Sequence, residues 1–337
     1  MARECSRKPA GAPPFPCATT ERGCWRRSLR HSRKPALLPR NPRDSDRSMA
    51  LRFVHCSDIH LLDLEGVGLQ RFLNKRLTGG INLALGRRKS HGPHLFDAIV
   101  ERARALDADR LVVTGDVTNL ALESEFELVR RKFGEAGLPV TVIPGNHDAY
   151  TRGSVRSRRF ESYLSAFMEG DRQSGHDYPF VQRFDGVALI GLSTAIATLP
   201  LFATGRLGDD QLVRLDAILE SLGREGVARV VLIHHPVLEG VSKARHDLLD
   251  LGAFNRVIAR RGAELILHGH EHFEIEGVLP GPEAEAVVHG IASGTSLSQK
   301  TGRNGAFSLY TVAPGGIARA HYKWDGHEFI GGEETLH

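Results

Sequence analysis

The chain has 337 residues, of which 41% are hydrophobic, so it can bury the core of one large α/β domain or two small ones. No apolar run approaches the ~18 residues that a membrane-spanning helix needs, so we predict no membrane span. The formal net charge is +4, but residues 1–48 hold 12 Lys and Arg against 4 Asp and Glu, whereas the remainder holds 32 against 36. The remainder is therefore mildly acidic, which disfavours nucleic acid as its partner.

Residues 1–48 form a segment of their own in composition. They are rich in Arg, Pro and Ser, lack apolar periodicity and contain no apolar core of the kind a secretory signal requires. We expect them to be a disordered basic leader outside the mature fold. Met49 directly precedes the first strand-like segment, and we hypothesise that translation starts there. An Arg-rich targeting peptide is the alternative, and the intact mass of the protein from its native gene distinguishes the two.

Cysteine usage follows the same division of the chain. Three of the four cysteines lie in the leader, and Cys56 alone lies beyond it. The folded part therefore cannot form an internal disulfide, which indicates a reducing compartment. We expect the protein to be cytoplasmic.

Strands and helices are predicted to alternate along the first part of the chain, and antiparallel strands follow. The predicted strands cover residues 51–56, 110–114, 140–143, 180–184, 187–192, 230–233, 264–267, 273–279, 286–291, 307–312 and 318–324. The predicted helices cover residues 93–106, 122 to near 137, 156–168, 209–222 and 251–261. Such alternation implies a parallel sheet with functional loops at the carboxyl ends of its strands. We expect a single domain over residues 49–337, with residues 66–88 as a surface elaboration or a helical insertion near the site.

Five predicted strand ends carry side chains of the types that bind metal ions. They are Asp58 and His60, Asp116, Asn146 and His147, His234 and His235, and His270 and His272. Because these loops emerge at one edge of an α/β sheet, residues far apart in sequence can converge there. Packing carboxylates and imidazoles together without a cation would leave charges and donors unpaired. The pattern therefore predicts a metal site.

The number and type of candidate ligands favour two metal ions. Seven residues mix carboxylate, amide oxygen and imidazole with no thiolate: Asp58, His60, Asp116, Asn146, His234, His270 and His272. That is too many for one tetrahedral zinc and suits a pair of divalent ions such as Mn, Fe or Zn. A bridging carboxylate can hold two such ions ~3.5–4 Å apart, and the pair lowers the pKa of a shared water to near neutrality.

These five loops resemble, in order, the motifs of the calcineurin-like metallophosphoesterases. The matching segments are Asp58-x-His60, Gly115-Asp116, Gly145-Asn146-His147-Asp148, His234-His235-Pro236 and Gly269-His270-x-His272. The resemblance spans residues 51 to 275 or so. It implies a four-layer α/β/β/α sandwich that carries a dinuclear metal centre.

The resemblance also implies a role for each matching residue. It assigns a ligand set to each metal: Asp58, His60 and His272 to one, and Asn146, His234 and His270 to the other. Asp116 would bridge the two ions. His147 would protonate the leaving alkoxide or bind the phosphoryl oxygens, and Asp148 would orient it. The implied reaction is in-line attack of a metal-bound hydroxide on phosphorus.

The remaining histidines are interpreted as supporting or structural. His235 follows the motif's ligand and is expected to lie beside the metal or to face the substrate. His268 is expected to be hydrogen-bonded at a turn. Isolated histidines are taken as structural or solvated: His55, His91, His94, His246 and His289. The family often has an acidic residue where Asn119 stands, but no metal contact depends on that position.

The resemblance implies a phosphodiesterase or phosphomonoesterase that acts on a small phosphate ester. Within the family, the chain looks most like the bacterial branch that includes 3',5'-cyclic nucleotide phosphodiesterases. One alternative is a pyrophosphohydrolase of nucleotide-linked lipids or sugars, for which residues 69–85 could supply an apolar lid. A repair-type nuclease is a further alternative, disfavoured by the acidic charge of the folded part.

A catalytically inactive scaffold of the same fold is the non-enzymatic alternative. Such a protein would be expected to lack several metal ligands, whereas every candidate ligand is present here. The sequence leaves the oligomeric state open.

Overall fold

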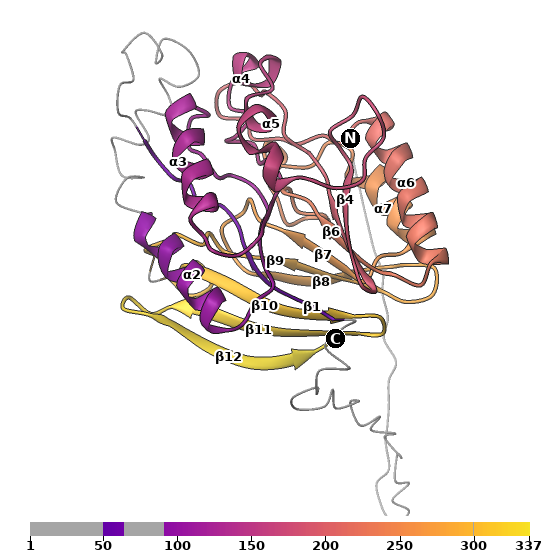
Figure 1. Ribbon diagram of the computed structural model, residues 1–337. Helices are drawn as coiled ribbons and strands as arrows, with labels where there is room; N and C mark the ends of the chain where they lie inside the picture. Colours follow the sequence, from indigo (N-terminus) through magenta and orange to yellow (C-terminus); the bar gives the residue numbers. More distant parts are fainter. Residues whose placement is uncertain (1–49, 64–90, 299) are drawn as a thin grey trace, which may run out of the picture. The chain divides into compact units, whose positions relative to one another are not determined.

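The computed structural model describes residues 50–63, 91–298 and 300–337 (Figure 1). The predicted basic leader, residues 1–48, and the candidate lid, residues 69–85, lie outside the described residues. Within them, one six-stranded sheet has the spatial order β12-β11-β10-β1-β2-β3. Its strands are β1 (Leu51–Cys56), β2 (Arg110–Val113), β3 (Val140–Val142), β10 (Ala306–Ala313), β11 (Gly316–Trp324) and β12 (Phe329–Leu336). β1, β2 and β3 run parallel, whereas β10 pairs antiparallel with β1.

The second sheet has the order β4-β5-β6-β7-β9-β8 and also contains six strands in the described part of the chain. These are β4 (Phe180–Phe184), β5 (Val187–Gly191), β6 (Ala228–Leu232), β7 (Leu265–His268), β8 (Ile275–Leu279) and β9 (Ala286–Gly290). β5, β6, β7 and β9 are parallel, and the edge strands β4 and β8 are antiparallel to their neighbours.

The helices cover the outer faces of the two sheets (Figure 1). Side chains of β5 alternate: Leu189 packs into the core shared with the first sheet, and Ile190 packs against α6 (Asp209–Arg224) and α7 (Leu251–Arg261). The apolar stripes of α2 (Pro93–Ala105) and α3 (Glu123–Gly134) pack into the core of the first sheet. The predicted four-layer α/β/β/α sandwich is therefore confirmed. No helix among the described residues is both long and apolar enough to cross a bilayer.

Two of the local predictions differ from the structure. The single helix predicted over residues 156–168 is instead α4 (Arg152–Arg156), α5 (Arg159–Leu164) and a 3₁₀ turn, η4 (Ser165–Phe167). The break falls at Arg158, whose φ of 48° is left-handed and cannot continue a helix. Strand β12 was not predicted, because Gly331 and Gly332 interrupt its apolar alternation; both have positive φ beside a register shift against β11.

A group of polar side chains is buried between the two sheets. His55 Nε2 lies 2.8 Å from Thr114 Oγ1, and His289 Nδ1 lies 2.9 Å from the Tyr310 hydroxyl. Burial lowers the pKa of His55 to about 3 and that of His289 to about 2, from an ordinary value of 6.5. Both rings are therefore neutral in the folded protein at neutral pH, because a charged imidazole would lose its hydration there.

We predict that these two histidines make the fold sensitive to acid. Below pH 6.5 each of these histidines binds a proton in the unfolded chain but not in the folded chain. The free energy of unfolding therefore decreases by about 1.4 kcal/mol per histidine for each unit by which the pH is lowered. Urea unfolding between pH 7 and about 4 should show a weaker pH dependence for His55→Gln and His289→Gln than for the natural chain. His327→Gln, at an exposed position, is the control. Equal slopes in all four proteins would contradict the prediction.

Candidate metal centre

The predicted ligands from five loops meet at the carboxyl edge of the parallel strands, in two groups. The first group joins the loop after β1 to the loop after β7. His60 Nε2 lies 3.1 Å from His272 Nε2, which in turn lies 3.1 Å from Asp58 Oδ1. His60 Nδ1 donates to the carbonyl oxygen of Thr118. The other nitrogen of the His60 ring therefore presents its lone pair to the cluster.

The second group joins the loops after β3, β6 and β7. Asn146 Oδ1 lies 2.8 Å from His270 Nδ1 and 3.1 Å from His234 Nε2, and these two nitrogens are 3.3 Å apart. Asn146, His234 and His270 are thus the ligand set that the resemblance assigned to one metal, brought together from three loops.

Asp116 lies between the two groups. Its Oδ1 atom is 3.5 Å from His234 Nε2, and its Oδ2 atom is 4.0 Å from His60 Nε2. Potential ligand atoms of Asp58, His60, Asp116 and His272 all lie within 4.8 Å of one another. One carboxylate thus has an oxygen directed to each group, which is the arrangement a bridging ligand requires.

The hydrogen bonds around the second group test whether a cation fits there. His234 Nδ1 donates to the Thr114 carbonyl oxygen, and His270 Nε2 donates to the His246 carbonyl oxygen. When both rings are neutral, their facing nitrogens carry lone pairs, and Asn146 Oδ1 is an acceptor as well. Three acceptors within 3.3 Å of one another then favour a positive charge among them, which is a bound cation or, without one, a proton on His234. The mixed oxygen and imidazole donors suit a divalent cation.

The pKa values at the site also indicate that positive charge stabilises its buried carboxylates. Burial would raise the pKa of Asp116, but the charges of His234 and His147 outweigh it and hold this pKa well below its usual value. Burial would lower the pKa of His234, but the Asp116 carboxylate raises it to about 9. Burial likewise opposes ionisation of Asp58, and His272 reverses the effect and lowers its pKa. The carboxylates therefore stay ionised although buried.

Backbone strain is concentrated in the same loops. Nine described residues other than glycine have a positive φ, and five of them are predicted ligands: Asp58, His60, Asp116, His270 and His272. Side chains with a Cβ rarely adopt this conformation, and it persists only where the surrounding structure enforces it. Its recurrence at the ligand positions indicates that the loops are shaped to aim these side chains.

The ring of His147 is held by a residue other than the one expected. We predicted that Asp148 orients His147, but His147 Nδ1 donates instead to the Asn119 carbonyl oxygen at 2.7 Å. Asp148 accepts from the backbone N–H groups of Gly145 and Thr118 and from the Thr118 hydroxyl. Burial and the nearby Asp116 charge raise the pKa of Asp148. Asp148 therefore joins the loops after β2 and β3, and its effect on His147 is indirect.

Two residues that support the site were missed by sequence reasoning. Asn119 also donates its side-chain amide to the His60 carbonyl oxygen at 2.6 Å. Glu125, in the first turn of α3, accepts from the backbone N–H groups of Asn119, Leu120 and Leu122. An acidic residue in the first turn of a predicted helix was the available signal for Glu125. Together they fix the loop that carries Asp116.

His235 and His268 use ring nitrogens within the protein. His235 Nε2 donates to the Ala203 carbonyl oxygen, and its Nδ1 lies 2.7 Å from Thr194 Oγ1. Its ring packs against that of His270, with centroids 4.3 Å apart. His268 Nδ1 lies 3.1 Å from the Gly269 carbonyl oxygen. Burial lowers the pKa of His235 to about 3 and that of His268 to about 4. These are the contacts of neutral rings that support the loops.

Two glycines allow the loops to approach one another. A Cβ atom on Gly145 would lie 2.2 Å from Asp116 Oδ1, and one on Gly269 would lie 2.3 Å from Asp58 Oδ2. Real Cβ atoms do not come so close to their neighbours, so a larger residue would displace these carboxylates. Glycine is therefore required at positions 145 and 269, where the backbone of each loop passes close to a ligand carboxylate.

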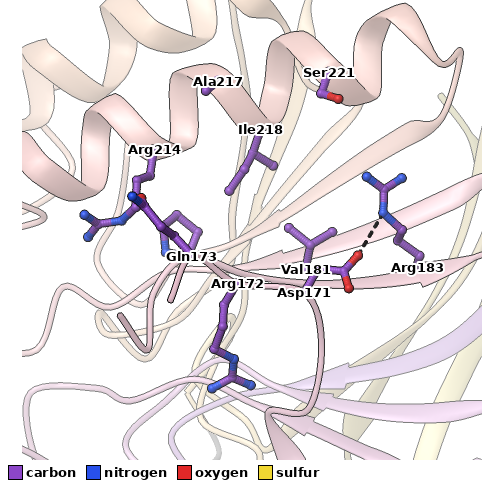
Figure 2. Close-up of a pocket in the computed structure, with 10 residues that line it drawn as sticks. Asp171, Arg172, Gln173, Val181, Arg183, Arg214, Ala217, Ile218 and Ser221 are labelled. Carbon is purple, nitrogen blue, oxygen red and sulfur yellow. Dashed lines mark hydrogen bonds and ion pairs between the residues drawn. The ribbon is translucent and has the colours of Figure 1, made fainter. Parts of the chain in front are cut away.

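Figure 2 shows a different cavity, of about 340 Å³, between α6 and β4. Arg183 in its wall pairs with Asp171 at 3.1 Å, and Ile218 from α6 contributes apolar surface. Its lining residues come from β4, α6 and the segments that precede β4, and none is a predicted ligand. The predicted ligands therefore lie at the convergent loops and not in this cavity.

Comparison with known proteins identifies the family. Residues 51–274 match the family described as calcineurin-like phosphoesterase. The chain belongs to this family. The matched residues include all five loops that carry the predicted ligands.

Two relatives of this chain carry functional names. A probable cyclic nucleotide phosphodiesterase from a Synechococcus species is 30% identical over 178 residues, which are 52% of this chain and 62% of the relative. The glycerophosphodiester phosphodiesterase GpdQ from Enterobacter lignolyticus is 28% identical over 168 residues, which are 49% of this chain and 56% of that protein. The alignments thus span less than two thirds of each relative.

Solved structures share the fold of this chain. A dimetal phosphatase from Danio rerio superposes with a TM-score of 0.57 at 14% identity, covering 85% of this chain and 98% of that one. The purple acid phosphatase PPD1 from yellow lupin gives a TM-score of 0.55 at 12% identity, covering 86% of this chain and 54% of that one. At these identities the likeness establishes the fold alone.

We predict that Gly145→Ala weakens metal binding. The new methyl group would displace Asp116, so the affinity for Mn²⁺ measured by isothermal titration calorimetry should fall at least ~10-fold. Gly134→Ala is the matched control, because a Cβ there meets nothing within 4 Å. That control should keep the natural affinity and gain up to about 1 kcal/mol in the free energy of unfolding. Natural affinity in Gly145→Ala would refute the proposed packing.

Proposed function

We propose that this protein is a metal-dependent phosphodiesterase that hydrolyses a small phosphate ester. The observation that carries the proposal is Asp116, with one oxygen directed to each of two ligand groups at the carboxyl edge of the strands. Family membership and two phosphodiesterase relatives support the reaction class. The presence of every candidate ligand argues against a catalytically inactive scaffold.

In this proposal each group holds one divalent cation, and Mn, Fe and Zn are the candidates. The ligand sets are Asp58, His60 and His272 for one cation, and Asn146, His234 and His270 for the other. Asp116 would be the ligand that both cations share. When bound, such a pair activates water for attack on phosphorus and neutralises charge on the phosphoryl oxygens.

His147 is proposed as the residue that handles the leaving group. Its Nδ1 donates to the Asn119 carbonyl oxygen, so its Nε2 can donate to a substrate oxygen when the ring is protonated, as a general acid must be. Its ring lies edge-on to that of His60, with centroids 4.9 Å apart, which sets it beside the first ligand group. From there it can protonate the departing alkoxide or hydrogen-bond the phosphoryl oxygens. Asp148 acts as a positioning residue through the backbone of the loop.

The substrate class proposed first is a 3',5'-cyclic nucleotide, supported by the Synechococcus relative. A glycerophosphodiester is the second candidate, supported by the Enterobacter relative. We further propose a cytoplasmic location, supported by a free cysteine, Cys56, in the described residues. Profiling the purified enzyme against cyclic nucleotides, glycerophosphodiesters and nucleotide diphosphate sugars distinguishes the substrate classes.

We predict hydrolysis of bis(p-nitrophenyl) phosphate that Mn²⁺ or Zn²⁺ stimulates and a chelator abolishes. Asp116→Asn should lower kcat at least ~100-fold, because an amide has only one oxygen and no negative charge to share between two cations. Asp185→Asn, at an exposed turn, is the matched control and should keep full activity. Unchanged, metal-independent hydrolysis in Asp116→Asn would favour the scaffold alternative.

His147→Ala should discriminate between leaving groups. We expect turnover of an alkyl phosphodiester to fall ~10²–10⁴-fold, because an alkoxide needs a proton as it departs. Turnover of a nitrophenyl ester should fall much less, because nitrophenolate leaves without one. Steady-state kinetics on both substrates provide the comparison, and equal losses would remove the general-acid role from His147.

A further inference from the structure

His91 lies beside the first ligand group, although its position in the sequence suggested no role. It lies two residues before the start of α2, and its ring centroid is 5.0 Å from that of His60 and 5.9 Å from that of His272. A ring nitrogen of His91 and those of His60 and His272 lie within 4.8 Å of one another. Three imidazoles from three distant parts of the chain therefore meet at one point.

The hydrogen bonds of two hydroxyl groups decide which nitrogen of His91 faces the cluster. Ser293 Oγ donates to the Asp58 carbonyl oxygen at 2.6 Å, and Thr295 Oγ1 donates to the Ile59 carbonyl oxygen at 2.9 Å. His91 Nδ1 lies 3.0 Å from Thr295 Oγ1 and 3.3 Å from Ser293 Oγ. Because each hydroxyl has one hydrogen and has already donated it, His91 Nδ1 must donate to them. In the neutral ring Nε2 therefore carries the lone pair.

The same contacts fix His91 to the ligand loop. Ser293 and Thr295 hold both the backbone of Asp58 and Ile59 and the ring of His91. The backbone is held as well, because Gly92 N donates to the Thr295 carbonyl oxygen and His91 forms a bridge to Ser296. An imidazole held in this way can bind a cation with little loss of conformational entropy.

We propose that His91 Nε2 is a further ligand of the cation held by Asp58, His60, Asp116 and His272; the proposal rests on the proposed function. Two nitrogens bound to one cation at ~2.1 Å lie at most ~4.2 Å apart, and a ring nitrogen of His91 already lies within 4.8 Å of ring nitrogens of His60 and His272. His91 groups with the two imidazoles of that site and approaches it from their side. The first group then offers three imidazoles and the second offers two.

This difference has a consequence for metal preference. A site richer in imidazole favours Co²⁺ and Zn²⁺ over Mn²⁺, whereas carboxylate and amide oxygens suit Mn²⁺. The site that contains His91 is therefore the one that prefers Co²⁺ or Zn²⁺. Removal of His91 should weaken binding of Co²⁺ at this site more than binding of Mn²⁺.

The proposal is tested by titrating the purified chain with Co²⁺ alone. Calorimetry measures the binding, and the visible absorption of bound Co²⁺ reports its ligands. The informative variant is His91→Asn, whose side-chain N–H can still reach Ser293 and Thr295 but which lacks a nitrogen at the Nε2 position. We expect the natural chain to bind two Co²⁺ ions and His91→Asn to bind one of them ~10–100-fold more weakly, with altered absorption. His94→Ala, at an exposed position in the first turn of α2, is the control and should match the natural chain.

The outcomes separate this proposal from the proposed function. Natural Co²⁺ affinity and absorption in His91→Asn, with two ions bound, would overturn the role of His91 and leave the dinuclear site intact. If the natural chain binds no pair of ions and Asp116→Asn behaves identically, the proposed function itself fails. His91→Ala, measured for thermal stability and Co²⁺ affinity together, adds a second test. A loss of stability in His91→Ala with natural affinity in folded His91→Asn would show a structural role and contradict the proposal.

Discussion

The buried carboxylate of Asp116 is the feature on which the rest of the site depends. It stands at the end of β2, is 2% exposed, and directs one oxygen toward His234 and the other toward His60. Its Oδ1 atom also accepts the backbone N–H of His147, and its carbonyl oxygen accepts the backbone N–H of His60. A buried negative charge is stable only with positive charge close by. Asp116 thus links four loops and sets where cations can lie.

The architecture around Asp116 keeps strained loops in place. The β1-β2-β3 and β5-β6-β7 ladders end at one edge, and the loops beyond them adopt left-handed backbone at ligand positions. Gly145 and Gly269 allow close passage, while Asp148 and Glu125 gather backbone N–H groups. Ser293, beyond the second sheet, holds the first loop by its carbonyl oxygen. Many separate contacts therefore support one arrangement of ligands, as a preorganised site requires.

The parallel strands and the convergence of the ligands could be predicted from the sequence, because both follow from the pattern of residues along each strand and just after it. Apolar runs specify buried strands, and parallel strands bring their carboxyl ends together. The sequence did not predict side-chain orientations that depend on backbone atoms far along the chain. The carbonyl oxygen that holds His147 belongs to Asn119, and any residue there offers the same atom. The left-handed turn at Arg158 has no glycine to signal it, and the contacts of His91 depend on hydroxyls far along the chain.

Anomalous X-ray diffraction from crystals grown with Mn²⁺ can show whether two cations flank Asp116. We expect two anomalous peaks ~3.5–4 Å apart, each within bonding distance of a different Asp116 oxygen. One peak should lie beside Asp58, His60 and His272, and the other beside Asn146, His234 and His270. A single peak, or peaks remote from Asp116 in a fully loaded crystal, would rule out a dinuclear centre bridged by Asp116.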